Sequence, residues 1–73
     1  MLLTYIHNHK LFIQFDRVIN KGLIYITGDN EFEETKKVNN SNFEIIALPE
    51  KIKNIKITIN VEKTRIIRTI KIE

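Results

Sequence analysis

An alternation of branched apolar and polar side chains near the end of the chain constrains the fold more than any other feature. From Ile55 to Val61 every second residue is isoleucine or valine, and the positions between them hold lysine, threonine and asparagine. Successive side chains of a strand point to opposite faces, so this pattern predicts a half-buried β-strand. The same period recurs along most of the chain, and few stretches support a helix. We therefore predict an all-β fold.

The length of the chain sets the scale of that fold. Its 73 residues can bury one small core, and we expect a single all-β domain over residues 1–73 without a separate catalytic lobe. The absence of cysteine excludes disulfides as a source of extra stability. Hydrophobic residues make up 42% and charged residues 29%, close to the averages for globular domains, which argues against disorder.

Turn residues divide the apolar runs into six short strands, with a seventh left open. The expected strands are 2–7, 11–19, 23–27, 43–48, 55–61 and 65–72. For the polar segment 31–38 we favour an exposed strand or loop over a short helix capped by Asn30 and Glu33. The expected architecture is an antiparallel meander folded into a small antiparallel β-sandwich or partly open barrel of about six to seven short strands.

Residues 11–27 read as a hairpin. Asn20-Lys21-Gly22 is a suitable loop, because glycine can supply the positive φ that such a loop needs. Both flanking segments carry apolar residues on both faces. The hairpin is therefore expected either to be central and covered on both sides, or to bend at a bulge near Asp16-Arg17.

The last two strands form a second expected hairpin. Pairing Val61 with Ile66 aligns their apolar faces, but it also places Lys56 opposite Lys71, and directly opposed lysines repel. Either this register is wrong, or the outer face of the hairpin is a mildly basic surface.

The charge distribution singles out the same C-terminal region. The chain carries a net charge of +3 with a pI near 9.3, and residues 50–73 hold seven basic and three acidic groups. Such a balance can indicate an anionic partner. However, 15 isoleucines, nine lysines and eight asparagines are the bias that an AT-rich genome would produce. A solvated surface is therefore the favoured interpretation, and a polyanion-binding surface is the alternative.

Candidate chemical groups do not form a recognised site. His7 and His9 would point to the same side of a strand and could supply two metal ligands, but no neighbour completes the set, so we interpret them as a polar hairpin tip. The acidic residues Asp29, Glu31, Glu33, Glu34 and Glu44 resemble a solvated loop more than an acid and base pair. The only glycines, Gly22 and Gly28, are isolated. We expect no enzyme activity, no cofactor and no metal.

The N-terminal segment gives no targeting signal. Met1 to Ile6 lacks a basic start, and polar residues follow from His7 onward before a signal-peptide core could form. No apolar run approaches the ~18 residues of a membrane helix. We expect a cytoplasmic protein without membrane contact.

These observations favour a non-catalytic protein-binding, accessory or inhibitor module that acts through an exposed sheet edge or face, including self-association. The isoleucine-rich strand 65–72 is the best candidate edge. The alternative is a small nucleic-acid-binding barrel that uses the basic C-terminal hairpin, for which Tyr5 and Tyr25 are the best candidate exposed aromatics, although core rings are the favoured interpretation of both. The candidate partner or polyanion surface comprises Lys53, Lys56, Thr58, Arg65, Ile67 and Lys71.

Overall fold

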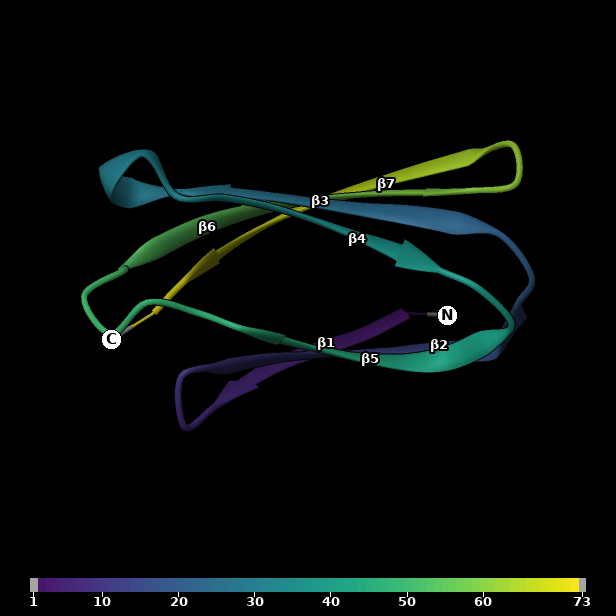
Figure 1. The fold of residues 1–73 in the computed structure, drawn as a ribbon, viewed down its shortest axis with the longest axis horizontal. Helices are drawn as coiled ribbons and strands as arrows, with labels where there is room; N and C mark the ends of the chain where they lie inside the picture. The colour runs from purple at the N-terminus through teal and green to yellow at the C-terminus, as the bar shows by residue number, and fades with distance from the viewer. Residues whose placement is uncertain (1, 73) are drawn as a thin grey trace.

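Two antiparallel sheets packed face to face form the molecule (Figure 1). The computed structural model describes residues 2–72. One sheet has three strands in the order β1-β2-β5, and the other has four in the order β4-β3-β6-β7. The strands are β1 (Leu2–His7), β2 (Lys10–Ile19), β3 (Gly22–Gly28), β4 (Glu33–Val38), β5 (Ser41–Ala47), β6 (Asn54–Val61) and β7 (Thr64–Lys71). The predicted small β-sandwich is confirmed, and segment 31–38 supplies the seventh strand, β4.

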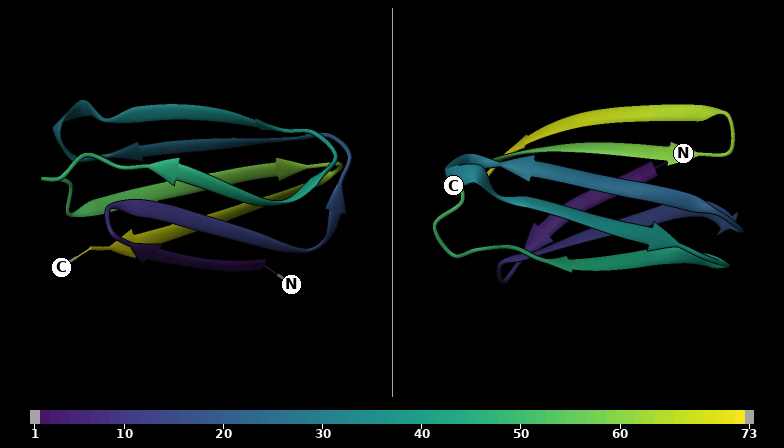
Figure 2. Two further views of the ribbon diagram at one scale, coloured as in Figure 1. Left: turned by 60° about the horizontal axis from the view of Figure 1, so that its bottom comes forward. Right: turned by 45° about the horizontal axis from the view of Figure 1, so that its top comes forward.

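The connections interleave the sheets, so the predicted simple meander is wrong. The chain passes from one sheet to the other after β2, after β4 and after β5 (Figure 2). As a result, β2 pairs with β5 and β3 pairs with β6, which are strands far apart in the sequence. This is the Greek-key type of connection that is common in β-sandwiches.

The predicted hairpin over residues 11–27 is also wrong, because β2 and β3 lie in different sheets. No described glycine has a positive φ. Gly22 instead permits a close approach, since a Cβ atom there would lie 2.8 Å from Cγ1 of Val61. The expected bend in β2 is present, because the pairing of β2 with β5 shifts register between Gln14 and Ile19. β2 itself stays in the three-stranded sheet: its inner face carries Ile13 and Phe15, which are buried in the core, and Phe12 lies on its outer face.

The C-terminal hairpin forms as predicted but in a different register. Val61 pairs with Thr64 rather than Ile66, so the loop is the two residues Glu62 and Lys63. Glu62 adopts a φ of 54°, in the left-handed region that such tight loops require. The two-residue shift keeps every side chain on its predicted face, and it places Lys56 opposite Thr69 instead of Lys71. The shorter loop therefore removes the lysine repulsion that the predicted register contained.

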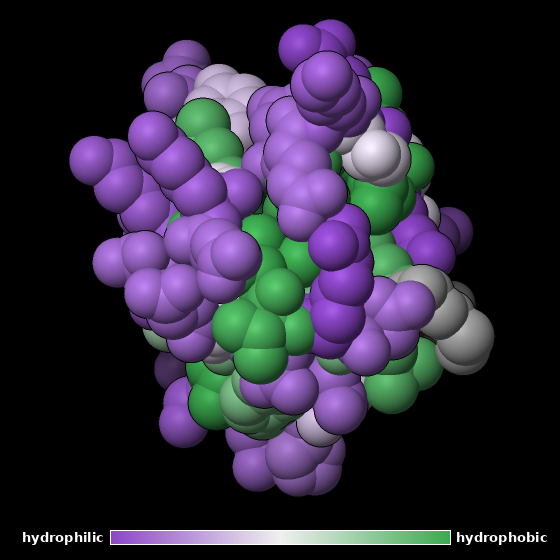
Figure 3. Space-filling view, turned by 90° about the vertical axis from the view of Figure 1, so that its right-hand side faces the viewer, coloured by the Kyte–Doolittle hydropathy of each residue, from purple (hydrophilic) through white to green (hydrophobic). Residues whose placement is uncertain are grey.

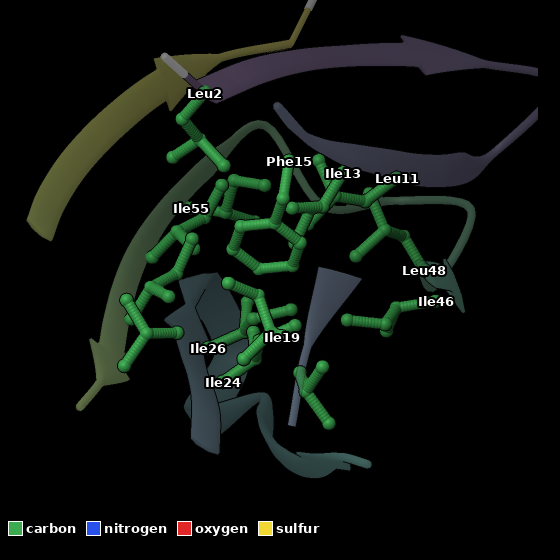
Figure 4. Close-up of a cluster of buried hydrophobic side chains, with 14 of the residues drawn as sticks. Leu2, Leu11, Ile13, Phe15, Ile19, Ile24, Ile26, Ile46, Leu48 and Ile55 are labelled. Carbon is green, nitrogen blue, oxygen red and sulfur yellow. The ribbon is translucent and has the colours of Figure 1, made fainter. Parts of the chain in front are cut away.

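The core lies between the sheets and is mostly isoleucine (Figure 4). Ile13 from the three-stranded sheet and Ile24, Ile26, Ile57 and Ile59 from the four-stranded sheet are fully buried. These isoleucines stand at the alternate positions of their strands that point toward the opposite sheet. No polar or charged residue among residues 2–72 is buried. The described residues contain no helix long and apolar enough to cross a membrane.

Candidate binding surfaces

The outer surface of the three-stranded sheet carries large apolar side chains. Leu3 and Tyr5 come from β1, Phe12 from β2, and Phe43 and Ile45 from β5; we call these five residues the aromatic face. The register aligns Tyr5, Phe12 and Ile45 in one row across the sheet. The exposed fractions are 49% for Leu3, 45% for Tyr5, 39% for Phe43 and 44% for Ile45. An apolar group of this kind on three adjacent strands is typical of an interaction surface.

Phe12 organises the aromatic face. Its ring lies parallel to that of Tyr5, with centroids 4.8 Å apart and planes 6° apart, and it lies 6.0 Å from the ring of Phe43 at 31°. Such offset and tilted pairs hold aromatic side chains in defined positions. The face is therefore an ordered surface rather than a set of scattered apolar residues. Lys10 and His7 lie beyond the Tyr5 row and give its margin a basic side.

The predicted C-terminal surface lies on the opposite side of the sandwich. Five of the six predicted residues lie on the outer side of the β6–β7 hairpin, and we call this group the basic face: Lys56, Thr58, Arg65, Ile67 and Lys71. Thr58 pairs directly with Ile67, and Nε of Arg65 donates to Oδ1 of Asn60 at 3.1 Å. Ile67 is 54% exposed. The structure thus brings these five residues together on one surface.

Lys53, the sixth predicted residue, lies in the loop before β6 and beside an acidic group. The carboxylate of Asp29 accepts hydrogen bonds from the backbone N–H groups of Lys53 at 2.9 Å and Asn54 at 2.8 Å. These two bonds hold the pKa of Asp29 below its ordinary value. The carboxylate fastens the turn after β3 to the start of β6. It also offsets the charge of Lys53, which is therefore not part of the basic face.

The two aromatic residues singled out in the sequence occupy different surroundings. Tyr5 is exposed on the aromatic face, whereas Tyr25 is half-buried on the outer side of β3, in register with Thr58. The Tyr25 hydroxyl donates a hydrogen bond to the neighbouring carboxylate of Glu33, and this bond raises the pKa of Tyr25. Tyr5, Phe12 and Phe43 all lie on the sheet opposite the basic face. Most of the exposed aromatic surface is therefore separated from the C-terminal cations.

The strand that the sequence singled out as an edge is an edge. β7 pairs with β6 through eight consecutive positions and lies at the end of the strand order β4-β3-β6-β7. The right-hand view of Figure 2 shows β7 along the upper margin of the molecule, with β6 on one side of it. Its other main-chain side is unpaired by any described strand.

Two open hollows lie at the ends of the sandwich. One, of about 330 Å³, lies beside the β1–β2 turn and is lined by Ile6, His7, Asn8, His9, Leu48, Pro49, Ile52 and Ile72. The other, of about 740 Å³, lies at the opposite end and is lined by Asn20, Lys21, Gly22, Leu23, Lys37, Val38, Asn39, Asn60 and Glu62. Figure 3 looks onto this second end, where hydrophilic side chains surround a central area of apolar surface.

Neither histidine nor carboxylate positions form a metal centre in the described part of the chain. Asn8 and His9 form the tight turn between β1 and β2, with φ values of 50° and 61°, as the interpretation of a polar hairpin tip requires. Among residues 2–72 no three histidine, cysteine or acidic side chains form a metal-ligand group. Glu44 instead lies 3.7 Å from Nζ of Lys36 and links the edges of the two sheets. Arg17 and Glu62 form a similar link at 3.0 Å.

Sequence reasoning overlooked most of the aromatic face. In their strands, Phe12 and Phe43 point to the face opposite the one that carries buried residues such as Ile13 and Ile46. Apolar residues on both faces of one strand were the feature of the sequence that indicated a second apolar surface. It could not be used without knowing that β1, β2 and β5 share a sheet, because only their pairing gathers the five side chains on one surface.

Comparisons with known proteins add no family to this description. No family model matches the sequence, and no curated protein shows significant similarity to it.

Proposed function

We propose that this chain is a non-catalytic protein-binding domain whose partner is a different protein that docks on the aromatic face. The observation that carries the proposal is the ordered group of four exposed side chains around the half-buried ring of Phe12 on three adjacent strands: Leu3, Tyr5, Phe43 and Ile45. Leu3, Tyr5, Phe43 and Ile45 face away from the core and are at least 39% exposed, so burial in the core does not account for their being apolar. Burying them against a partner would remove apolar surface from water, which is the main source of affinity in protein association.

The chemistry of the face defines the kind of partner. Its centre lacks ionised groups, and aromatic rings of this kind favour an aliphatic or aromatic counterpart. Its basic margin at Lys10, together with the net charge of +3, favours an acidic rim on the partner. A second copy would instead bring an equal positive charge. A different, acidic protein is therefore the occupant to which the proposal commits.

Each half-exposed side chain of the face can contribute roughly 1 kcal/mol when it becomes fully buried. Replacing one of them with a lysine also places a charge in the interface, so this single change is expected to weaken binding more than tenfold. The direct test is affinity capture from the native cells with the wild-type domain and with Ile45→Lys, followed by titration of the purified captured protein. The matched control is Ile67→Lys, at an isoleucine of the basic face that is 54% exposed, against 44% for Ile45.

The expected result is a partner that the wild type and Ile67→Lys bind with equal affinity and that Ile45→Lys does not bind. Sedimentation measurements on the isolated domain test the choice of partner. A dimer that dissociates in Ile45→Lys would assign the face to a second copy. A partner that binds Ile45→Lys as tightly as the wild type would rule out docking on this face.

The nucleic-acid interpretation stays a prediction with less support. The basic face presents Lys56, Arg65 and Lys71 together, but stacking of bases also needs exposed rings, and Tyr25 is the nearest one. It predicts binding to DNA or RNA that weakens steeply with salt and is lost on charge reversal at these positions. The cytoplasmic location likewise stays a prediction from the sequence.

A further inference from the structure

The outer edge of β7 offers a continuous row of unpaired main-chain groups. The N–H group of Ile72 donates to the carbonyl oxygen of Lys53 across the end of the β6–β7 ladder. In antiparallel strands, residues alternate between pointing both main-chain groups toward the partner and pointing them away. Ile70, Arg68, Ile66 and Thr64 therefore share the direction of Ile72. The main-chain groups that point away from β6 belong to Arg65, Ile67, Thr69 and Lys71.

This edge is neither short nor bulged, and its protection comes from charge, with Arg65 and Lys71 on the outer side and Arg68 on the inner side. β7 has eight residues, no proline and no shift of register, whereas β1 and β4 each have six residues. Short, bulged or proline-containing edges discourage additional strands, and a long regular edge permits one. On the opposite side of the sandwich, the edges β4 and β5 are linked to each other by Lys36 and Glu44. β7 is thus the longest regular edge of the described structure.

Side-chain charge on β7 selects the strand that this edge can accept. Arg65, Arg68 and Lys71 are all exposed, and β7 contains no acidic residue. None of the three forms an ion pair with another residue in the range 2–72. Half-buried Ile66 and Ile70 lie on the inner side of the strand and exposed Ile67 on the outer side. An incoming strand would meet positive charge along its whole length with isoleucine on both sides.

We propose that the β7 edge binds an acidic, extended segment of a partner protein as an additional strand of the four-stranded sheet. Main-chain hydrogen bonds to Arg65, Ile67, Thr69 and Lys71 supply affinity, and acidic side chains beside the cations supply selectivity. The inference rests on the proposed function in taking the partner to be a protein, and it concerns a surface separate from the aromatic face.

A second copy of β7 satisfies the main-chain groups but not the charges. Two copies related by a two-fold axis pair antiparallel, and the register centred on Arg68 places the two Arg68 side chains directly opposite each other. A register shifted away from this one pairs fewer of the four outward-facing residues, so it relieves the repulsion only by losing main-chain hydrogen bonds. Like charges on neighbouring strands are destabilising, so the edge favours an acidic segment over self-pairing.

The probe for this inference is an acetylated and amidated eight-residue peptide of alternating glutamate and valine. In a strand its glutamates fall on one face, beside Arg65 and Lys71, and its valines on the other, beside Ile66 and Ile70. Titration of the nitrogen-15-labelled full chain is expected to slow amide hydrogen exchange at least tenfold at four positions: Arg65, Ile67, Thr69 and Lys71. A peptide with every second amide N-methylated is expected not to bind, because it cannot complete the ladder.

Matched variants separate the edge from general charge. The double variant Arg65→Glu with Lys71→Glu is expected to weaken peptide binding at least tenfold. Lys21→Glu with Lys37→Glu changes the net charge equally, away from the edge, and is expected to bind as the wild type does. Thr69→Pro removes one outward donor while leaving the ladder with β6 intact, and it too is expected to weaken binding.

Several results would overturn the inference. Equal binding of the N-methylated peptide would mean that charge alone attracts it. Perturbation of these residues by oligothymidylate but not by the peptide would favour a nucleic acid, and a dimer lost in Thr69→Pro would favour a second copy. Ile45→Lys is expected to leave peptide binding unchanged, so failure of the edge and failure of the aromatic face can be told apart.

Discussion

In both sheets, inward-facing and outward-facing side chains alternate along the strands, but one outer surface is apolar and aromatic and the other is basic. On the three-stranded sheet the outward phase of the strands holds Leu3, Tyr5, Phe12, Phe43 and Ile45, with two stacked or tilted ring pairs. On the β6–β7 hairpin the outward phase holds Lys56, Thr58, Arg65 and Lys71 around Ile67. In both sheets the core is built from inward-facing side chains, such as Ile13 in one sheet and Ile57 in the other. The difference teaches that burial in the core explains only half of the apolar residues in the three-stranded sheet.

The largest losses of stability are expected from changes in the shared core, where the two sheets should respond alike. Ile13 lies beneath the aromatic face and Ile57 beneath the basic face, and both are fully buried. Truncation to alanine at either position removes the same atoms and leaves a cavity, which costs about 2–5 kcal/mol of unfolding free energy. Urea unfolding of Ile13→Ala and Ile57→Ala checks this. A loss below about 1 kcal/mol in only one variant would contradict a single core shared by both sheets.

A smaller effect should separate the centres of the two outer surfaces. Phe12→Ala removes a half-buried ring that contacts the rings of Tyr5 and Phe43, and it is expected to cost roughly 2 kcal/mol. Thr58→Ala, at the centre of the basic face, is expected to cost less than about 1 kcal/mol, because it removes only a small polar group. Both values come from urea unfolding. Equal losses would mean that the aromatic pairs contribute no more to the unfolding free energy than the side chain of Thr58 does.

The link between the turn after β3 and the start of β6 is expected to be acid-sensitive, because the carboxylate of Asp29 makes it. Asp29→Asn removes the charge from the acceptor of the Lys53 and Asn54 N–H groups, and it should destabilise the fold less than Phe12→Ala does. The folded-state pKa of Asp29 lies below its ordinary value of 3.8. Its stabilisation is therefore fully present above the unfolded-state pKa and is lost as the pH falls through the folded-state pKa.

Thermal unfolding of the wild type and Asp29→Asn at several pH values measures this contribution. The difference in stability should be present near neutral pH and should shrink below about pH 4. A difference that stays constant over this range would attribute the effect to packing rather than to the charge of Asp29.

The smallest effects are expected from charges placed on the exposed isoleucines. Ile45→Lys and Ile67→Lys should each change the unfolding free energy by about 0.5 kcal/mol or less, because 44% and 54% of these residues are already exposed. Thermal unfolding of both variants checks the values. A loss above about 1.5 kcal/mol for Ile45→Lys alone would mean that the aromatic face stabilises the folded monomer instead of serving a partner.

Local patterns predicted the strands well because each strand needs only its own alternation. The strand from Ile55 to Val61 and the strand from Leu2 to His7 lie where the sequence places them. The C-terminal pairing was predicted two residues out of register, since alternation is unchanged by a shift of two and only the tight turn at Glu62 selects one register. The candidate basic surface was largely gathered as expected, because its five residues belong to one local hairpin.

The sequence by itself determined an all-β chain, the positions of six of its seven strands, the core-facing side of the C-terminal hairpin and the basic character of that hairpin. These properties depend on neighbours within a few residues. Only the tertiary structure decided that β2 and β3 separate into different sheets, that β7 lies at a free edge, and that Phe12 and Phe43 meet on one surface. Those outcomes depend on which distant strands pair. Several pairings satisfy the same alternation, and packing of the whole core selects among them.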